Sequence, residues 1–323
     1  INLISLLLRH PETKIIWISS EAAHVGKKIS ELFPHFLGET ELVIKEKGEA
    51  SEVDVVFFAT PHCLAMRLVP SVLSSGSKVI DLSADYRFCE VGIFKKWYKV
   101  DHASPNLLGE TVYGLPELHK EKIKSSKLVG NPGCYPTAAI LGAAPLVKED
   151  LIDKESLIFD AKSGVSGAGR TPMEATHFPE CNEGVSAYTP LTHRHTGEIE
   201  QELGTKVIFV PHLIPMTRGI LTTIYANSKI KIQSSKLMKI YQDFYKDAPF
   251  VRILQDVLPS TKYVYGTNFC DIAVKVDEEG NKIIVLSAID NLIKGAAGQA
   301  IQNMNLMFNL PEKMGLENIG VYP

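Results

Sequence analysis

The sequence lacks the features that mark membrane, nucleic-acid-binding and disulfide-stabilised proteins. It has no basic block, its longest apolar runs are strand-length or interrupted, and its net charge is only −3 over 323 residues. Neither a membrane nor a nucleic-acid partner is therefore indicated. The five cysteines are scattered, odd in number and without CxxC spacing, which argues against a disulfide framework and against a zinc site. We expect a protein of the reducing cytoplasm that holds no metal.

What the sequence does contain is a series of strand and helix patterns, with enough apolar residues for two domains (45% hydrophobic). Continuous apolar runs at 14–18, 54–59 and 78–82, and the run ending at Leu128-Val129, are typical of parallel strands covered on both faces. A helix is expected at 64–73, broken or bent by Pro70. This order predicts an α/β fold with a Rossmann-like doubly wound sheet in residues 1–133, and ligands at the carboxyl ends of its strands.

The pattern changes beyond residue 157, where the predicted strands become longer. We expect strands at 157–161, 206–210 and 220–225, a hairpin of 271–276 with 282–288 around the turn 277–281, and a helix at 235–246. These elements predict a second, α+β domain over 134–290 with a mixed or antiparallel sheet. We expect it to carry the catalytic and substrate-binding residues.

One stretch, Gly130 to Ala138, places Cys134 where a strand passes into a helix. Its glycines permit a tight turn, and Pro136 suits the first helical turn. A helix start offers unpaired N–H groups and the positive end of the dipole, which favour thiolate over thiol. We interpret Cys134 as a nucleophile, and the alternative is a buried structural cysteine.

The stretch Gly-Asn-Pro-Gly-Cys-Tyr-Pro-Thr resembles the active-site signature of the N-acetyl-gamma-glutamyl-phosphate reductases of arginine biosynthesis. Six further blocks agree with that family in its order along the chain: 81–87, 113–117, 161–170, 193–200, 211–219 and 290–299. The resemblance implies NADP as cofactor and a C-terminal region, 291–323, that packs on the first domain and completes it. We also expect a homo-oligomer, either dimer or tetramer.

A cysteine nucleophile needs a proton donor and acceptor, and histidine is the usual one. His193 and Glu198 are five residues apart, as are His195 and Glu200, so either carboxylate could steady its imidazole across a helix start. Taken alone, a loop histidine can also be a surface residue or a cap. The resemblance favours His193 with Glu198, which makes the expected catalytic set Cys134, His193 and Glu198.

The expected cofactor residues follow the predicted strands. Ser19 and Ser20, with Lys27 and Lys28 nearby, could receive a 2′-phosphate; alternatively Ser20 caps a helix beside a solvated lysine pair. The Gly-rich stretch 161–170 could wrap backbone N–H groups around an anion or admit a nicotinamide, or it could be a mobile turn. The full set is Ser19, Ser20, Thr60, Pro61, Ser83, Ser163, Gly164, Ser166, Gly167 and Asn291.

Four arginines are the cationic candidates for a substrate that carries phosphate and carboxylate, because a guanidinium can bind either group bidentately. Any of them could instead be a structural salt-bridge partner, and the sequence does not rank Arg87, Arg170, Arg194 and Arg218. We expect Arg87, Asn131 and Arg194 to bind the substrate.

The first eleven residues have the pattern of the back half of an amphipathic helix stopped by Pro11. The strand and Gly-rich turn that normally open a dinucleotide-binding domain are missing before it. We hypothesise that the natural polypeptide extends upstream, and that a protein beginning at Ile1 binds NADPH poorly.

The resemblance implies NADPH-dependent reduction of N-acetyl-L-glutamyl 5-phosphate to N-acetyl-L-glutamate 5-semialdehyde and phosphate, through a thioester at Cys134. One alternative is the same chemistry on N-acetyl-aminoadipyl phosphate of lysine biosynthesis, which is one methylene longer. More distant alternatives are a Cys-His hydrolase or acyltransferase, and a catalytically silent binding protein on the same fold.

Overall fold

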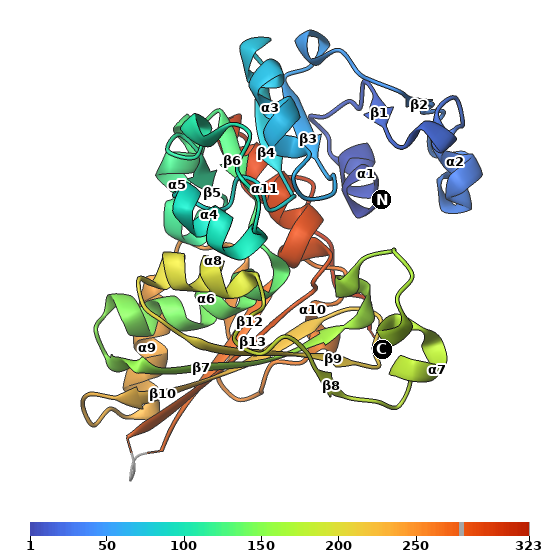
Figure 1. The fold of residues 1–323 in the computed structure, drawn as a ribbon. Helices are drawn as coiled ribbons and strands as arrows, with labels where there is room; N and C mark the ends of the chain where they lie inside the picture. The colour runs from blue at the N-terminus through green and yellow to red at the C-terminus, as the bar shows by residue number, and fades with distance from the viewer. Residues whose placement is uncertain (278–280, 323) are drawn as a thin grey trace.

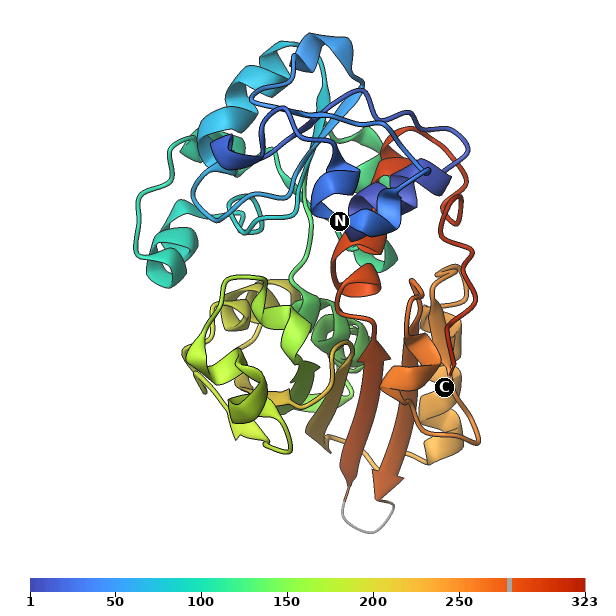
Figure 2. The ribbon, with the colours of Figure 1, turned by 90° about the vertical axis from the view of Figure 1, so that its right-hand side faces the viewer.

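The computed structural model describes residues 1–277 and 281–322. Figures 1 and 2 show two packed units, one built from the N-terminal segments with the C-terminal helix α11, the other around a large sheet. Within the described ranges, none of the helices combines the length and the apolar character needed to cross a membrane.

The first unit contains the predicted parallel sheet. Its strands run in the order β3-β4-β6-β5, all parallel. Their bounds are β3 Val55–Phe58, β4 Lys78–Asp81, β5 Val112–Tyr113 and β6 Leu128–Gly130, and the helices of this unit before residue 134 are α1 Asn2–Arg9, α2 Ile29–Leu32, α3 Ala65–Ser74, α4 Val91–Tyr98 and α5 Pro116–Ser125. The doubly wound α/β class predicted from the sequence is confirmed.

The strand predicted at 14–18 is wrong. Only Ile18–Ser19 forms a strand (β1), and it pairs with β2 (Ile44–Lys45) in a separate two-stranded sheet. Ile16 is 41% exposed, and the indole N–H of Trp17 donates to the carbonyl of Glu49 at 3.2 Å. The apolar run therefore lies along the surface of the first unit and not between two layers of helices.

Of the break or bend predicted at Pro70, the break does not occur: α3 continues through this residue. Proline has no N–H to donate to the carbonyl four residues earlier, which here belongs to Met66. The hydroxyl of Ser104 donates to that carbonyl at 2.8 Å instead. A side chain from a later loop thus replaces the missing helical bond.

The second unit is organised around a seven-stranded mixed sheet in the order β11-β12-β13-β10-β7-β9-β8. The predicted hairpin is present as antiparallel β12 and β13, although 278–280 of its turn lie outside the described residues. The strand bounds are β7 Ile152–Gly164, β8 Ser186–Ala187, β9 Ile208–Ile214, β10 Ile220–Ser228, β11 Val251–Ile253, β12 Cys270–Asp277 and β13 Lys282–Ile289. This is the mixed sheet expected of an α+β unit.

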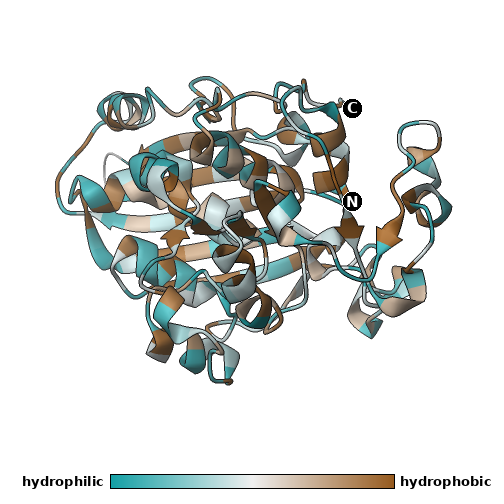
Figure 3. Ribbon diagram, turned by 90° about the horizontal axis from the view of Figure 1, so that it is seen from above, coloured by the Kyte–Doolittle hydropathy of each residue, from teal (hydrophilic) through white to brown (hydrophobic). Residues whose placement is uncertain are grey.

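Helices cover one face of this sheet (Figure 1), and the hydrophobic segments gather on central strands and helices when the molecule is seen from above (Figure 3). The helices of this unit are α6 Cys134–Lys148, α7 Phe178–Cys181, α8 His195–Leu203, α9 Ser234–Phe244 and α10 Thr261–Val264; α6 and α9 pack on the sheet, and α8 packs on α6. Pro145 within α6 leaves the carbonyl of Leu141 without its helical donor, and the Tyr245 hydroxyl donates to it at 2.5 Å. This contact fixes α6, which begins with Cys134, against the end of α9.

The last helical segment begins as a π-helical turn, η7 (Ile293–Ala297), and continues as α11 (Gly298–Met307). Its apolar side chains Ile301 and Met304 join Ile80, Ile123 and Val129 in one buried cluster. The C-terminal segment therefore shares a buried core with the strands and helices of the first unit.

Candidate active site

Cys134 is the first residue of α6 and follows the carboxyl end of β6, as predicted. Its side chain is partly buried. Burial raises the pKa of the Cys134 thiol to about 11, and Arg87 together with the backbone N–H of Tyr135 offsets only part of that rise. The helix start lowers the pKa as expected, but burial outweighs it. The thiol is therefore protonated at neutral pH and needs a base before it can attack.

Glu198 is the centre of the hydrogen-bond network around this turn. Its side chain is fully buried in the first turn of α8. One carboxylate oxygen, Oε2, accepts from the backbone N–H of Gly133 and from the Tyr113 hydroxyl, both at 3.0 Å. The other, Oε1, accepts from Nη1 of Arg87 at 3.2 Å. Glu198 thus fastens α8 to the turn that carries Cys134.

The two histidines occupy different positions relative to Glu198. Nε2 of His195 lies 3.8 Å from its Oε1, whereas within the described residues no hydrogen bond or ion pair joins Glu198 to His193. The alternative pair of His195 with Glu200 is also absent, since Glu200 binds Lys206 at 2.7 Å. Both pairings expected from the five-residue spacing are therefore wrong in this structure.

His193 packs among aromatic rings of the same cluster. Its Nδ1 accepts the backbone N–H of His195 at 3.1 Å, and its ring centroid lies 5.7 Å from Tyr135 and 5.5 Å from Tyr188. Burial and then Arg194 lower its pKa to about 4. The imidazole is therefore neutral at neutral pH, and because Nδ1 accepts a hydrogen bond, the ring hydrogen lies on Nε2.

Of the four arginines, Arg87 is held by protein groups. It is buried, and it donates from Nε to the carbonyl of Asn131 at 2.7 Å and from Nη2 to that of Leu82 at 2.9 Å. Arg218 binds Asn2 at 2.7 Å. Arg194 is exposed, lies 5.0 Å from the Tyr98 ring centroid, and has no hydrogen-bond partner among the described residues.

Asn131, expected to contact substrate, instead uses its amide within the protein. Its Nδ2 donates to the carbonyl of Ala296 at 3.1 Å, and its Oδ1 accepts from Asn303 at 3.1 Å. The side chain therefore joins the turn before Cys134 to η7 and α11.

Comparisons with known proteins agree with this site. Residues 1–126 match the family profile described as "Semialdehyde dehydrogenase, NAD binding domain", and residues 134–291 the one described as "Semialdehyde dehydrogenase, dimerisation domain". N-acetyl-gamma-glutamyl-phosphate reductases of Symbiobacterium thermophilum and Caldicellulosiruptor bescii are 48% and 50% identical to this chain, over all of it and 96% of their own length. The chain belongs to this reductase family.

Solved structures of related dehydrogenases share the fold. Aspartate semialdehyde dehydrogenase II from Vibrio cholerae superposes with a TM-score of 0.73 at 15% identity, over 95% of this chain and 96% of its own. An aspartate semialdehyde dehydrogenase with NADP from Candida albicans gives 0.72 at 15% identity, over 95% and 94%. The reductase family and these dehydrogenases therefore have one architecture.

Five of the residues expected to bind NADP form one cluster. Asn291 accepts the backbone N–H of Gly219 at 2.7 Å and donates to Oγ of Ser166 at 3.0 Å. A Cβ at Gly167 would lie 2.9 Å from Oγ of Ser163, and one at Gly164 would lie 2.7 Å from the carbonyl of Met216. The glycines therefore let this loop pack tightly against its protein neighbours.

The other expected cofactor residues lie in the first unit. Thr60 and Pro61 follow β3, and Oγ1 of Thr60 is buried without a partner among the described residues, which fits a hydrogen bond to the cofactor. Ser83 is buried and donates to Asp81 at 2.9 Å. Ser19 ends β1 and Ser20 follows it, so both lie at the two-stranded sheet of β1 and β2, apart from the four-stranded sheet (Figure 1).

Several residues of the site were not identified from the sequence. Tyr113 ends a strand at the ligand-bearing edge of the sheet, and that placement is the signal that would have found it. Gly133 is needed because a Cβ there would lie 2.5 Å from Nε2 of His195. Tyr98 and His62 were also missed: their ring centroids lie 5.5 Å apart, and the predicted Arg194 lies 5.0 Å from the Tyr98 centroid, a grouping that no local pattern indicates.

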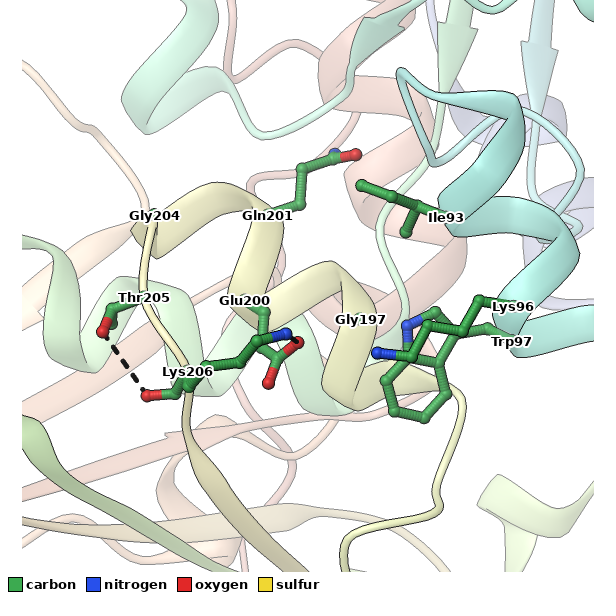
Figure 4. A pocket seen from close by; sticks show the side chains of 9 residues that line it. All are labelled: Ile93, Lys96, Trp97, Gly197, Glu200, Gln201, Gly204, Thr205 and Lys206. Atoms are coloured by element: carbon green, nitrogen blue, oxygen red, sulfur yellow. Dashed lines mark hydrogen bonds and ion pairs between the residues drawn. The ribbon is translucent and has the colours of Figure 1, made fainter.

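A hollow of about 360 Å³ lies on another side of α8, where α4 approaches it (Figure 4). Trp97 of α4 packs on Gly197, where a Cβ would lie 2.3 Å from the indole nitrogen. None of the predicted site residues lines this hollow; its lining is Ile93, Lys96, Trp97, Gly197, Glu200, Gln201, Gly204, Thr205 and Lys206.

Proposed function

We propose that this protein uses NADPH to reduce N-acetyl-L-glutamyl 5-phosphate to N-acetyl-L-glutamate 5-semialdehyde, with release of phosphate. The observation that carries the proposal is Cys134, a partly buried thiol at the start of α6 and at the ligand-bearing edge of the sheet. Relatives with that activity in their name, at 46–50% identity over 96% of their own length, support it.

In this mechanism Cys134 attacks the acyl carbon and phosphate leaves, which produces a thioester on the sulfur. We assign the thiol proton to His193, whose neutral ring lies 5.7 Å from the ring of Tyr135, the residue next to Cys134. A ring that accepts at Nε2 carries its other hydrogen on Nδ1, where the N–H of His195 now donates. We therefore expect the His193 ring to turn when substrate binds.

The start of α6 stabilises the negative oxygen that forms during attack. The backbone N–H groups of Cys134 and Tyr135 point toward the sulfur, and donors at a helix start suit a developing oxyanion. When bound, the reduced nicotinamide supplies the hydride that converts the thioester to the aldehyde level. His193 then returns a proton to the departing sulfur of Cys134.

We propose that Arg194, and not Arg87, binds an anionic group of the substrate. Arg87 is buried and already donates to two carbonyls and to Glu198, so its role is to hold the turn. Arg194 stands in the histidine segment, exposed and without a hydrogen-bond partner in the described part of the chain. A guanidinium in that state can bind carboxylate or phosphate bidentately.

The test is an absorbance assay run in reverse, with N-acetylglutamate semialdehyde, phosphate and NADP. We expect NADPH to form only when all three are present. Faster turnover of N-acetyl-aminoadipate semialdehyde would assign the protein to the longer substrate. Phosphate release from the acyl phosphate without any need for NADPH would assign it to the hydrolases and contradict the proposal.

We propose that the two units divide this work as expected from the sequence. Residues 1–133, completed by the segment after 290, bind the cofactor, and residues 134–290 carry the catalytic and substrate groups. The packing of α11 in the core of the first unit supports this division. The chemistry needs Cys134 as a free thiol, which a reducing cytoplasm maintains.

We further propose that a second copy of the chain covers the open face of the seven-stranded sheet. Ile284, Tyr225, Ile158 and Ile208 are register neighbours across β13, β10, β7 and β9, and each is 37–43% exposed. An apolar row of this kind suits an interface, and the match to a dimerisation domain supports a second copy.

Light scattering tests this homodimer. Tyr225→Lys should convert it to monomers, whereas Leu37→Lys, at a side chain that is 78% exposed elsewhere, should leave it intact. A Tyr225→Lys protein of unchanged mass would exclude this face as the interface.

A further inference from the structure

Glu117 and Lys294 form a buried ion pair that the proposed mechanism does not use. The ammonium nitrogen lies 2.7 Å from Oε1 of Glu117, and both side chains have no exposed area. Glu117 belongs to α5 in the first unit, and Lys294 belongs to the π-helical turn η7. The pair therefore joins α5 of the first unit to η7, the turn that leads into α11.

Further polar side chains complete the surroundings of this pair. Gln302 accepts from Lys294 at 2.7 Å and from Asn268 at 2.9 Å, and its Nε2 donates to Glu117 at 3.1 Å. The ring of Phe250 lies 5.7 Å from the ammonium group. Because Asn268 stands just before β12, α5, α11 and the second unit meet at this one point.

The turn that Lys294 belongs to supports the segment around Cys134 at two places. Gly295 lies so close that a Cβ on it would be 2.7 Å from Cβ of Cys134. The next carbonyl, of Ala296, accepts from the Asn131 amide at 3.1 Å. η7 therefore packs directly against Cys134 and the turn that precedes it.

A π-helical turn needs such an anchor, because its i→i+5 bonds are rare and occur mainly as single turns at functional sites. Here the N–H of Gly295 donates to Asp290 at 3.0 Å and that of Ala297 to Leu292 at 3.1 Å. A buried ion pair is a poor source of stability, since apolar side chains of similar volume are often as stable. Its directional contacts instead fix where the turn lies.

We propose that Glu117 and Lys294 are positioning residues that hold η7 against Cys134 and so set the place of the nucleophile. They touch neither substrate nor cofactor. The inference rests on the proposed function for its kinetic readout, but the position of the sulfur can also be followed chemically without substrate.

The test replaces both charges together with Glu117→Leu/Lys294→Met. We expect a folded protein with a thermal midpoint within a few degrees of the unmodified protein and an unchanged KM for NADP. Its kcat should fall at least tenfold, and the rate at which iodoacetamide alkylates Cys134 should change severalfold. The matched control is Arg252→Met/Asp271→Leu, which removes an ion pair of 2.6 Å at the sheet edge and should leave both rates unchanged.

A folded double variant with unchanged kcat and unchanged alkylation would overturn the proposal. If the double variant does not fold, Glu117→Gln is tested instead, because it keeps the shape of the side chain and one acceptor for Lys294. Unchanged kcat and an unchanged rate of Cys134 alkylation in Glu117→Gln would also overturn the proposal. If the unmodified protein itself forms no NADPH, the proposed function has failed, while the alkylation comparison still decides whether the pair positions Cys134.

Discussion

The contact between Gly295 and Cys134 gives the sharpest expectation for a single substitution. In Gly295→Ala the new methyl carbon would lie 2.7 Å from Cβ and 3.2 Å from Cα of Cys134, and 3.3 Å from a methyl group of Ile289. Ordinary contacts of a Cβ begin at 3.4 Å. The backbone of the catalytic turn must therefore move by about 0.7 Å, because the crowded atoms belong to Cys134 itself and are not the flexible end of a side chain.

A displacement of this size is large for catalysis and small for stability. A misplacement of about 1 Å can cost about 10²-fold in rate, so we expect kcat to fall by about 10- to 100-fold. Alanine is favoured over glycine by about 1 kcal/mol in a helix, which offsets part of the strain. The thermal midpoint should therefore change by only a few degrees.

The measurement is NADPH formation from the semialdehyde, phosphate and NADP, with alkylation of Cys134 followed in parallel. Gly92→Ala in α4 is the matched control, since a Cβ there would meet nothing within 4 Å. If Gly295→Ala turns over within twofold of the unmodified protein, the catalytic turn tolerates this displacement and the reasoning is refuted.

The remaining expectations concern the reacting groups. Cys134→Ser should abolish reduction while leaving the thermal midpoint unchanged, and more than a few per cent of residual turnover would remove Cys134 from the mechanism. His193→Asn should lower kcat by about 10²–10⁴-fold and His195→Asn by less; the reverse order would make His195, beside Glu198, the acid and base. Because burial raises the thiol pKa to about 11, alkylation of Cys134 without ligands should keep rising from pH 7 to pH 10, and a plateau below pH 9 would show that the thiolate forms more easily.

Local sequence was sufficient for the elements that local forces determine. The strands β3 and β4 were predicted because each is a continuous apolar run; β4 is mostly buried, whereas β3 alternates between half-buried and buried residues. Cys134 was placed at a helix start because glycine and proline limit the backbone around it. The run at 14–18 is also apolar, but no strand of the four-stranded sheet pairs with it. A local sequence pattern does not show whether a neighbouring strand is available for pairing.

The partners in the site could not be predicted in the same way. The helix α8 begins at His195 and not at Glu198, so His195 and Glu198 are three residues apart on one helix and share a face. His193 precedes the helix and points elsewhere. Arg87 and Tyr113, the other partners of Glu198, come from positions 111 and 85 residues away in the sequence, and only the folded chain brings them together.

The position of α11 also has a consequence for synthesis on the ribosome. The sheet of the first unit is translated early, but its core is closed by Ile301 and Met304 of a helix translated much later. A nascent chain that has not reached α11 carries Ile80 and Val129 without their covering side chains. Such half-made chains expose apolar surface and are prone to associate. We therefore expect the N-terminal unit to depend on chaperones until the whole second unit has been made.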